Sequence, residues 1–221
     1  MCLRGCLIEQ EVTVTEVSDD PRPAAGTEGA GAGPPSARVG VIVGSTRANR
    51  ICPEIARLVR GHLGAHSLLS YTLIDLGQID LPFLDEPFKP ALGGYAHEHT
   101  RSWSRLVSSF GAFVLVFPQY NWGYPAPLKN ALDFLYAEWR DKPVALVTYG
   151  TRGGARAAAQ MRTVLQGLHM PVVETSAEIK ISAADVDAEG QLVDAKELLA
   201  GYLGTFRDMD TELTAAALGR R

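Results

Sequence analysis

Hydrophobic and polar residues alternate in blocks along most of the chain. Five short runs rich in Val, Ile and Leu are typical of buried strands, and they cover residues 37–45, 68–76, 112–118, 142–150 and 171–181. Apolar residues at steps of three and four predict helices near 52–63, 97–110, 127–139, 154–168 and 199–213. Residues 77–95 are rich in Pro and Gly, so we expect a loop there.

Strand and helix patterns alternate five times, which is typical of a parallel sheet covered by helices on both faces. Five strands favour a flavodoxin-like three-layer α/β fold with strand order 2-1-3-4-5 over a six-stranded dinucleotide fold. Ligands of such sheets bind at the carboxyl ends of the strands, where the strand order switches. We therefore expect the functional site in the loops after the first, third and fourth strands.

Residues 1–37 do not share this pattern. Residues 21–37 consist mainly of Pro, Gly and Ala and lack large apolar side chains, which indicates a flexible linker. The preceding residues lack the apolar core of a secretory signal, and their acidic residues argue against a transit peptide. We expect a disordered tail, although Val12 and Val14 also allow a short strand against a partner, and we expect one domain over 38–218.

Composition narrows the function classes. The chain has 221 residues, is 46% hydrophobic and carries a formal net charge of −4, so no basic surface indicates nucleic acid or an anionic membrane as a partner. No apolar run approaches the roughly 18–20 residues of a membrane span. Cys2, Cys6 and Cys52 make neither a disulfide framework nor a metal quartet, so we expect a soluble cytoplasmic protein.

The loop after the first predicted strand combines hydroxyl and cationic side chains. A strand that runs into Gly-Ser-Thr and then into a helix places Ser45, Thr46 and backbone N–H groups at a positive helix end, which favours an anion. Arg47 and Arg50 would add donors for a phosphate. P-loop and dinucleotide glycine spacings are both missing. The alternative interpretation is an N-capped helix with two solvated arginines.

The loop after the third predicted strand, residues 118–127, is rich in aromatic side chains. Tyr120, Trp122 and Tyr124 stand beside Asn121 and Gly123, and aromatic groups with a few polar ones suit a flat heteroaromatic ligand. The alternative is a Pro-rich turn whose hydrophobic side chains only cover the end of the sheet.

Residues 150–154, after the fourth predicted strand, contain three glycines in five positions. Glycine lets the backbone approach a ligand closely and offer it N–H groups. A tight turn between a strand and a helix explains the same residues equally well.

Together, the three loops resemble the NADPH-dependent FMN reductase family, a flavodoxin-like group that includes azo-, quinone- and chromate-reductases. The similar segments are GSTRANR, PQYNWGYPAPLKNALDFL and YGTRGG, and the resemblance covers residues 38–181. Its most specific part is the string Pro-x-Tyr-Asn followed by Pro-x-x-Leu-Lys-Asn-Ala-Leu-Asp.

The resemblance implies FMN as a bound cofactor and NADPH as the reductant. It implies that the FMN phosphate is held by Ser45, Thr46, Arg47 and Arg50. It implies that the isoalloxazine ring lies along Pro118, Gln119, Tyr120 and Asn121. It implies that the other edge of the ring is wrapped by Gly150, Thr151, Arg152, Gly153 and Gly154.

The resemblance also implies a homodimer or homotetramer, with the helix that begins near Leu128 at a subunit contact. An intrahelical Lys129–Asp133 pair on a solvated face is the alternative. Two features depart from the family pattern. Many members have Glu in place of Gln119, and many have small residues where this chain has Trp122 and Gly123. Trp122 would narrow or cover the substrate site, so acceptor preference does not carry over.

We therefore predict an FMN-dependent NAD(P)H oxidoreductase, an enzyme that passes a hydride from NADPH through FMN to a small acceptor such as a flavin, a quinone or an azo compound. The flavin carries the chemistry, so no catalytic residue is assigned, although backbone N–H groups near Gly153 and Gly154 would stabilise negative charge on the reduced ring. A flavodoxin-like electron carrier and a non-catalytic flavin-binding module are the alternatives. We interpret His97 and His99 as solvated imidazoles at a helix start and expect no metal site.

Overall fold

The computed structural model describes residue 34 and residues 37–219. The strands are β1 (Arg38–Val43), β2 (Ser70–Asp75), β3 (Ala112–Pro118), β4 (Val144–Gly150) and β5 (Ala177–Lys180). The α-helices are α1 (Cys52–Gly64), α2 (Leu76–Ile79), α3 (Glu98–Ser108), α4 (Ala126–Asp133), α5 (Ala155–Gly167), α6 (Ala195–Ala200) and α7 (Leu203–Leu218). Two short 3-10 helices are η2 (Pro90–Leu92) and η3 (Ala183–Asp185). Apart from Pro34 and Ala37, the predicted tail and linker lie outside the described residues, as do Cys2 and Cys6.

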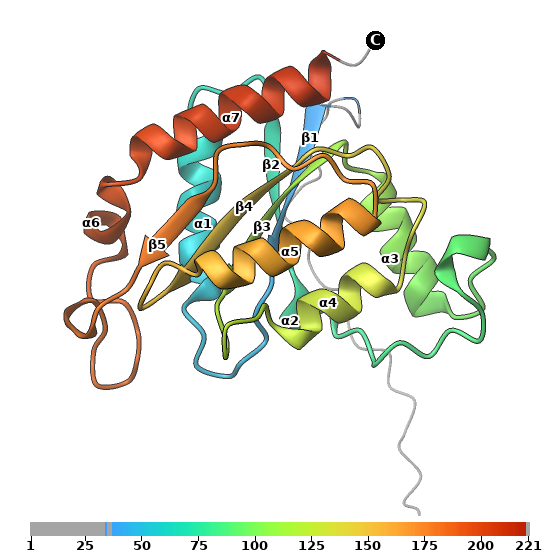
Figure 1. Cartoon of the computed structure of the whole chain (residues 1–221), viewed down its shortest axis with the longest axis horizontal. Coiled ribbons are helices and arrows are strands. Elements are labelled where there is room, and N and C mark those ends of the chain that lie inside the picture. The colour runs from blue at the N-terminus through green and yellow to red at the C-terminus, as the bar shows by residue number, and fades with distance from the viewer. Residues whose placement is uncertain (1–33, 35–36, 220–221) are drawn as a thin grey trace, which may run out of the picture.

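The five strands form one parallel sheet in the order β2-β1-β3-β4-β5 (Figure 1). This order confirms the predicted flavodoxin-like fold class. Val41 in β1 pairs with Leu73 in β2 on one side and with Val114 in β3 on the other. The strand order switches between β1 and β3, because the chain leaves β1 for one neighbour and later returns to add the other.

Helices cover both faces of the sheet and create two cores. Val41 packs with α1 and α7 on one face, whereas its neighbour Ile42 packs with α3, α4 and α5 on the other. In Figure 1, α4 and α5 lie in front of the strands, and α1 lies behind them. Burial on both faces explains why the strands read as continuous apolar runs rather than as alternating ones. No described helix combines the length and the apolar character needed to cross a membrane.

Helix α4 is shorter than the sequence pattern predicts. It ends at Asp133, whereas the apolar spacing predicts a helix to residue 139. The Trp103 indole N–H donates to the Ala131 carbonyl over 2.8 Å, and the Trp139 indole N–H donates to the Leu132 carbonyl over 3.1 Å. A longer helix would give both carbonyls to backbone N–H groups four residues later. The two buried indoles therefore replace the next turn of the helix.

The last strand and the last helix also differ from the prediction. Strand β5 covers only four of the eleven residues predicted. In the residues directly before β5, backbone groups form hydrogen bonds with side chains: Arg162 donates to the Val173 carbonyl, and the Thr175 N–H donates to Glu212. The predicted C-terminal helix is divided into α6 and α7 at Gly201 and Tyr202.

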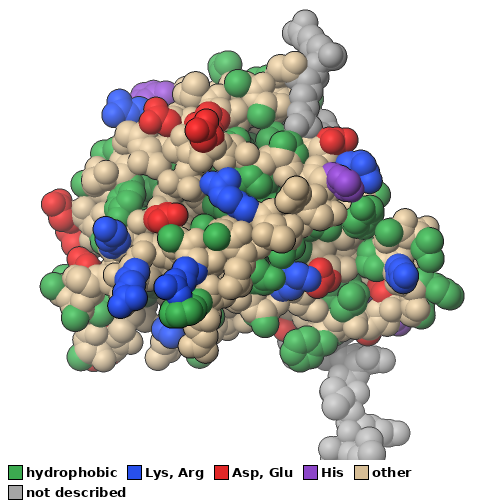
Figure 2. Space-filling model, in the orientation of Figure 1, with side chains coloured by type: hydrophobic (Ala, Val, Ile, Leu, Met, Phe, Trp, Pro, Cys, Tyr) green, Lys and Arg blue, Asp and Glu red, His purple; other side chains and the backbone are tan. Residues whose placement is uncertain are grey.

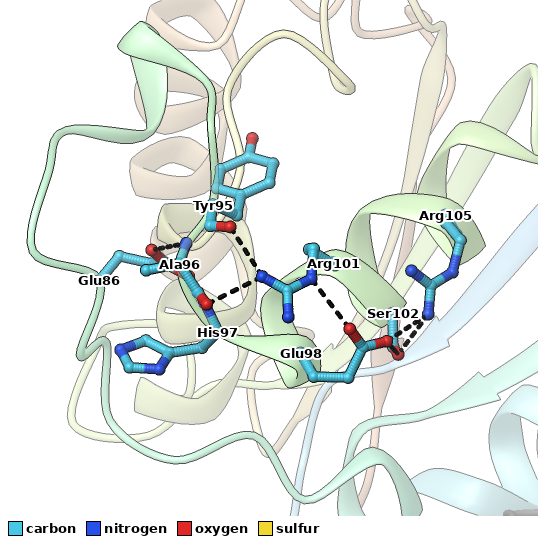
Figure 3. A network of polar contacts seen from close by, with 8 residues as sticks. All are labelled: Glu86, Tyr95, Ala96, His97, Glu98, Arg101, Ser102 and Arg105. Carbon is cyan, nitrogen blue, oxygen red and sulfur yellow. Dashed lines mark hydrogen bonds and ion pairs between the residues drawn. The ribbon is translucent and has the colours of Figure 1, made fainter.

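A polar network fastens the segment between α2 and α3 (Figure 3). The Glu86 carboxylate accepts from the backbone N–H groups of Ala96 and His97, over 2.8 and 3.1 Å, directly before the first turn of α3. Arg101 donates to the carbonyls of Tyr95 and Ala96 over 3.0 and 2.8 Å. Two side chains thereby bind the backbone at the end of this segment, directly before α3.

The two histidines at the start of α3 lie against this segment. Their rings stack with centroids 5.2 Å apart, and His99 Nε2 lies 2.9 Å from an Asp85 carboxylate oxygen. Glu98, between them in sequence, pairs with Arg101 and Arg105, and these guanidinium groups lower the pKa of its carboxyl to about 2. Over residues 37–219, no group of three or more His, Cys, Asp and Glu side chains is arranged to hold a metal ion.

The absence of a side chain at Gly40 is required by the packing on β1. A Cβ atom there would lie 2.8 Å from both Ile74 Cδ1 and Phe113 Cε1, inside a close-packed core. We expect Gly40→Ala to lower the free energy of unfolding by about 1–3 kcal/mol, as overpacked cores do. Urea unfolding followed by circular dichroism measures this change.

The matched control is Gly61→Ala, in the middle of α1, where a Cβ atom meets nothing within 4 Å. Alanine is favoured over glycine inside a helix by about 1 kcal/mol, so this variant should be at least as stable as the parent. Equal loss in the two variants would contradict the packing argument.

Candidate functional site

Three loops meet at one edge of the sheet. They follow β1, β3 and β4, which are hydrogen-bonded neighbours in the sheet. The sheet pattern of hydrogen bonds extends into two of the loops: the Gly44 N–H donates to the Val116 carbonyl over 2.8 Å, and the Gln119 N–H donates to the Tyr149 carbonyl over 2.9 Å. The structure thus brings together the three segments that the sequence singled out, at the expected end of the strands.

Ser45 joins the first loop to the second. Its side chain is fully buried, and its Oγ lies 2.9 Å from the Tyr120 hydroxyl, 75 residues away in sequence. The Ser45 hydroxyl therefore points to the second loop and does not line the neighbouring cavity. Its predicted contact with a phosphate remains a prediction.

Arg50 has a structural role that the sequence does not reveal. Its guanidinium makes a two-pronged ion pair with Asp75, with N–O distances of 2.5 and 2.9 Å, and it also donates to the Ser45 carbonyl. A Cβ atom on Gly77 would lie 2.7 Å from Arg50 Nη2, so the guanidinium packs directly against this glycine. Arg50 fixes the first loop to α2, and its predicted contact with a phosphate stays a prediction.

Thr46 and Arg47 belong to the exposed part of the first loop, residues 46–49. Both line a cavity of about 640 Å³ that lies between this loop, the segment after β2 and the start of α4. The cavity is also lined by Ala48, Arg50, Leu76, Gly77, Asp80, Leu81, Pro82, Phe83, Ala126, Pro127, Asn130 and Ala131. The first loop and the last two residues of the second loop line this cavity, whereas the third loop does not.

The second loop contains a tight turn with an unusual backbone. Tyr120 and Gly123 exchange both backbone hydrogen bonds, over 2.9 and 2.8 Å. The two residues between them, Asn121 and Trp122, have φ angles of +47° and +71°. A left-handed conformation is ordinary for Asn and costly for a bulky residue such as Trp. The fold therefore holds Trp122 in an unfavourable conformation, which is typical of functional loops.

Gln119 connects the second loop to the third. Its side-chain oxygen accepts a hydrogen bond from the Ala157 N–H over 3.2 Å, in the first turn of α5. Pro118, directly before it, is the buried last residue of β3. The neutral amide of Gln119 makes this contact without introducing a charge. A glutamate at the same position would make the contact with a negatively charged carboxylate.

The glycines of the third loop are required by their surroundings. Gly153 and Gly154 have φ angles of +79° and +88°. A Cβ atom on Gly153 would lie 2.9 Å from the Glu178 carbonyl oxygen, and one on Gly154 would lie 2.8 Å from Thr148 Cβ. The Thr148 hydroxyl closes the turn by donating to the Gly153 carbonyl over 2.8 Å. Gly150 is half-buried, and Thr151 and Arg152 are exposed beside the turn.

Cys52 and Tyr149 lie beneath the loops, and the sequence pattern assigned neither of them to the site. The Cys52 thiol donates to the Val116 carbonyl, and burial raises its pKa to about 11, so it stays protonated. Burial also raises the pKa of the Tyr149 hydroxyl, which lies against that thiol. Two neutral groups therefore support the charged first loop from below.

Residues of α2 and α4 that complete the cavity were also missed. Asn130 in α4 donates to the Pro82 carbonyl over 2.7 Å and accepts from the Leu84 N–H over 3.0 Å, which fastens the cavity wall to the helix. Asp75 caps α2 by accepting from the Gly77 N–H. The Asp-Leu-Gly that follows the second strand is the signal that could have pointed to this wall.

Comparisons with known proteins agree on one family. A model of the NADPH-dependent FMN reductase family matches residues 37–184. The chain is 46% identical over 147 residues to the NAD(P)H-dependent FMN reductase of Saccharomyces cerevisiae, covering 62% of this chain and 77% of the yeast protein. It is 27% identical over 179 residues to a 2-hydroxy-1,4-benzoquinone reductase from Burkholderia sp., covering 77% and 92% of the two chains.

Solved structures agree with this result. The chain is similar to FerB, a flavoenzyme NAD(P)H:(acceptor) oxidoreductase from Paracoccus denitrificans, with a TM-score of 0.57 and 27% identity over 79% of this chain and 97% of FerB. An NADH:FMN oxidoreductase solved in its apo form has a TM-score of 0.58 at 16% identity and supports the fold alone.

The Ser45–Tyr120 hydrogen bond yields a test of the first loop. We expect Tyr120→Phe and Ser45→Ala each to weaken FMN binding by about fivefold to tenfold, the effect of losing one hydrogen bond of about 1 kcal/mol. Riboflavin, which lacks the phosphate, should lose much less affinity. Fluorescence titration of each variant and of the double variant measures both affinities and the coupling between the two residues.

Tyr71→Phe is the control, because Tyr71 donates to Asp210 on the other side of the sheet, near the amino end of β2. Equal losses of FMN and riboflavin affinity in Tyr120→Phe would show that the Tyr120 hydroxyl acts on the ring site and not through Ser45 on the phosphate loop, contrary to the expectation.

Proposed function

The chain belongs to the NADPH-dependent FMN reductase family and is an FMN-dependent NAD(P)H oxidoreductase, and within that activity we propose that its electron acceptors are quinones. We further propose that the three loops at the carboxyl edge of the sheet hold FMN. The observation that carries the proposal is the meeting of the three family motifs at this edge, beside a cavity of about 640 Å³ lined by Thr46 and Arg47.

The first loop has the donors that a phosphate needs. Thr46 and Arg47 face the cavity, and Arg47 forms no ion pair with a described carboxylate. Arg50 already holds Asp75 and the Ser45 carbonyl, so its proposed role is to keep the loop in shape. Arginine offers several N–H donors in a fixed plane, which suits a phosphate better than a single ammonium group.

The second and third loops fit the two edges of a flat ring. The proposed contacts are those of Pro118, Gln119, Tyr120 and Asn121 on one side and of residues 150–154 on the other. Gly153 and Gly154 have no room for side chains. The Gly153 N–H already donates to the Gly150 carbonyl over 3.0 Å, so the donors that we propose for the ring are the other backbone N–H groups of residues 150–154. Such fixed donors stabilise negative charge near them at no cost of reorganisation.

The chemistry is divided between the cofactor and the protein. Bound FMN supplies the acceptance and delivery of hydride. The chain holds the phosphate, shapes the ring site with the strained Asn121–Trp122 turn, and leaves Tyr120 and Trp122 partly exposed at its mouth. Exposed aromatic side chains favour a planar acceptor, which supports quinones. The buried free thiol of Cys52 supports a cytoplasmic location as part of the proposal.

Reduction of the bound flavin tests the function. Under anaerobic conditions, NADPH should bleach the yellow absorbance of the FMN-loaded protein, and 1,4-benzoquinone added afterwards should restore it. Retention of the yellow colour after NADPH, in protein that binds FMN, would favour an electron carrier. Colourless protein that takes up no FMN would favour a non-catalytic module.

We also propose that the protein is a homodimer joined through the segment between α2 and α3. Its exposed apolar side chains are Phe83, Leu84, Phe88 and Leu92. The hydrogen bonds of Asn130 hold this segment against α4, so the exposed surface is fixed rather than free to fold inward. Figure 2 shows hydrophobic atoms on the lobe formed by this segment, at the right of the view.

Sedimentation velocity tests the dimer. We expect the parent protein to sediment as a dimer and the double variant Phe83→Ser/Phe88→Ser to dissociate, because two exposed aromatic side chains leave the interface. Leu68→Ser is the control, since Leu68 is also highly exposed but lies at the opposite end of the sheet. A dimer that is unchanged in the double variant would contradict this interface.

A further inference from the structure

Trp122 and Arg156 form an exposed stack beside the flavin loops. The Arg156 guanidinium carbon lies 3.4 Å from the centre of the Trp122 ring, which places the cation in contact with the face of the indole. Residue Trp122 is 59% exposed, and Arg156 is exposed as well. In Figure 2, Lys and Arg side chains gather with exposed hydrophobic atoms on the edge of the molecule near the start of α5.

The backbone at Trp122 adopts an unfavourable left-handed conformation that maintains this stack. Trp122 has a φ of +71°, and the paired hydrogen bonds between Tyr120 and Gly123 keep it there. An exposed Trp in a left-handed conformation adds nothing to the hydrophobic core. The conformation presents one face of the indole to Arg156, so the two residues form a prepared unit.

The charge of Arg156 is neither compensated by a carboxylate nor favoured by its place in the helix. Arg156 lies in the first turn of α5, where a cation is unfavourable and where no acidic residue is present. Among residues 37–219, no carboxylate forms an ion pair with Arg156. Because the stack occupies only the face of the guanidinium, the N–H groups at its rim remain available to an anion.

We propose that Arg156, held on Trp122, binds the 2′-phosphate of NADPH and makes the enzyme prefer NADPH to NADH. This inference rests on the proposed function and deepens it. A reductant that meets the flavin between the second and third loops must extend over the adjoining surface, and Trp122 and Arg156 border that surface. The 2′-phosphate is the group that NADH lacks, and arginine is suited to a phosphate because its planar rim can donate two parallel hydrogen bonds.

The overall charge of the protein supports this assignment. The chain carries a formal net charge of −4, so a polyanionic nucleotide is disfavoured by the protein as a whole. A local cation at the mouth of the site counteracts this unfavourable charge. A fixed guanidinium also loses less conformational freedom on binding than a mobile one.

The test compares the two nucleotides in the FMN-loaded enzyme. We expect Arg156→Gln to lower kcat/KM for NADPH by about tenfold or more, the effect of losing charge-assisted hydrogen bonds, and to lower kcat/KM for NADH much less. Arg207→Gln on α7 is the matched control, since it removes the same charge from an exposed position on the layer across the sheet.

A binding measurement gives a second readout that does not depend on turnover. Titration calorimetry should show that 2′,5′-ADP binds the parent protein more tightly than 5′-AMP does, and that Arg156→Gln removes this difference. Equal losses for NADPH and NADH, or no loss for either, would overturn the proposal. A change of oligomeric state in Arg156→Gln would overturn it too, by assigning the stack to a contact between copies.

Failure of the proposed function is recognisable separately. If neither nucleotide bleaches the flavin of the parent protein, the oxidoreductase reaction fails, and the calorimetric comparison of 2′,5′-ADP with 5′-AMP still decides whether Arg156 binds the phosphate.

Discussion

The hydrogen bonds that join β1 to β3 and β3 to β4 determine where the site lies. They bring Gly44, Gln119 and Gly150, which are far apart in sequence, to one edge of the sheet. Parallel strands all end at the same edge, so every loop that follows them starts there. The other features of the site depend on this constraint, because each loop begins at the end of a strand whose position is fixed.

The loops are then fixed to one another by side chains. Ser45 contacts the Tyr120 hydroxyl, and Gln119 accepts from the Ala157 N–H, so the first loop is bound to the second and the second to the helix after the third. These contacts hold the loops in a defined arrangement. A site whose parts are already ordered loses less conformational entropy on binding, which favours affinity for a cofactor that must stay bound between turnovers.

Three arginines at this edge of the sheet have different roles. Arg50 is paired with Asp75 and supports the first loop, whereas Arg47 lines the cavity and Arg156 stacks on Trp122. Only their surroundings separate these roles. A guanidinium with a carboxylate beside it has its donors satisfied, and one without a carboxylate keeps them for a ligand.

The sequence predicted the five strands, their parallel order and the three loops, because buried parallel strands need continuous apolar runs and glycines mark sharp turns. The sequence pattern predicted an α4 that continues to residue 139, which was wrong. The carbonyls of Ala131 and Leu132 accept hydrogen bonds from the indoles of Trp103 and Trp139, and the positions of these indoles depend on the packed core. The sequence pattern also missed the cavity wall formed by Leu76, Gly77 and Asn130, for the same reason.

The chain by itself therefore determined the class of fold, the family and the loops that carry its motifs, since these depend on local patterns of hydrophobicity, turn residues and spacing. Only the tertiary structure decided what each polar side chain does. Whether Arg50 meets a phosphate or Asp75, and whether Ser45 faces the cavity or Tyr120, depends on which groups lie within hydrogen-bond distance after folding. Those distances join residues that no local pattern relates.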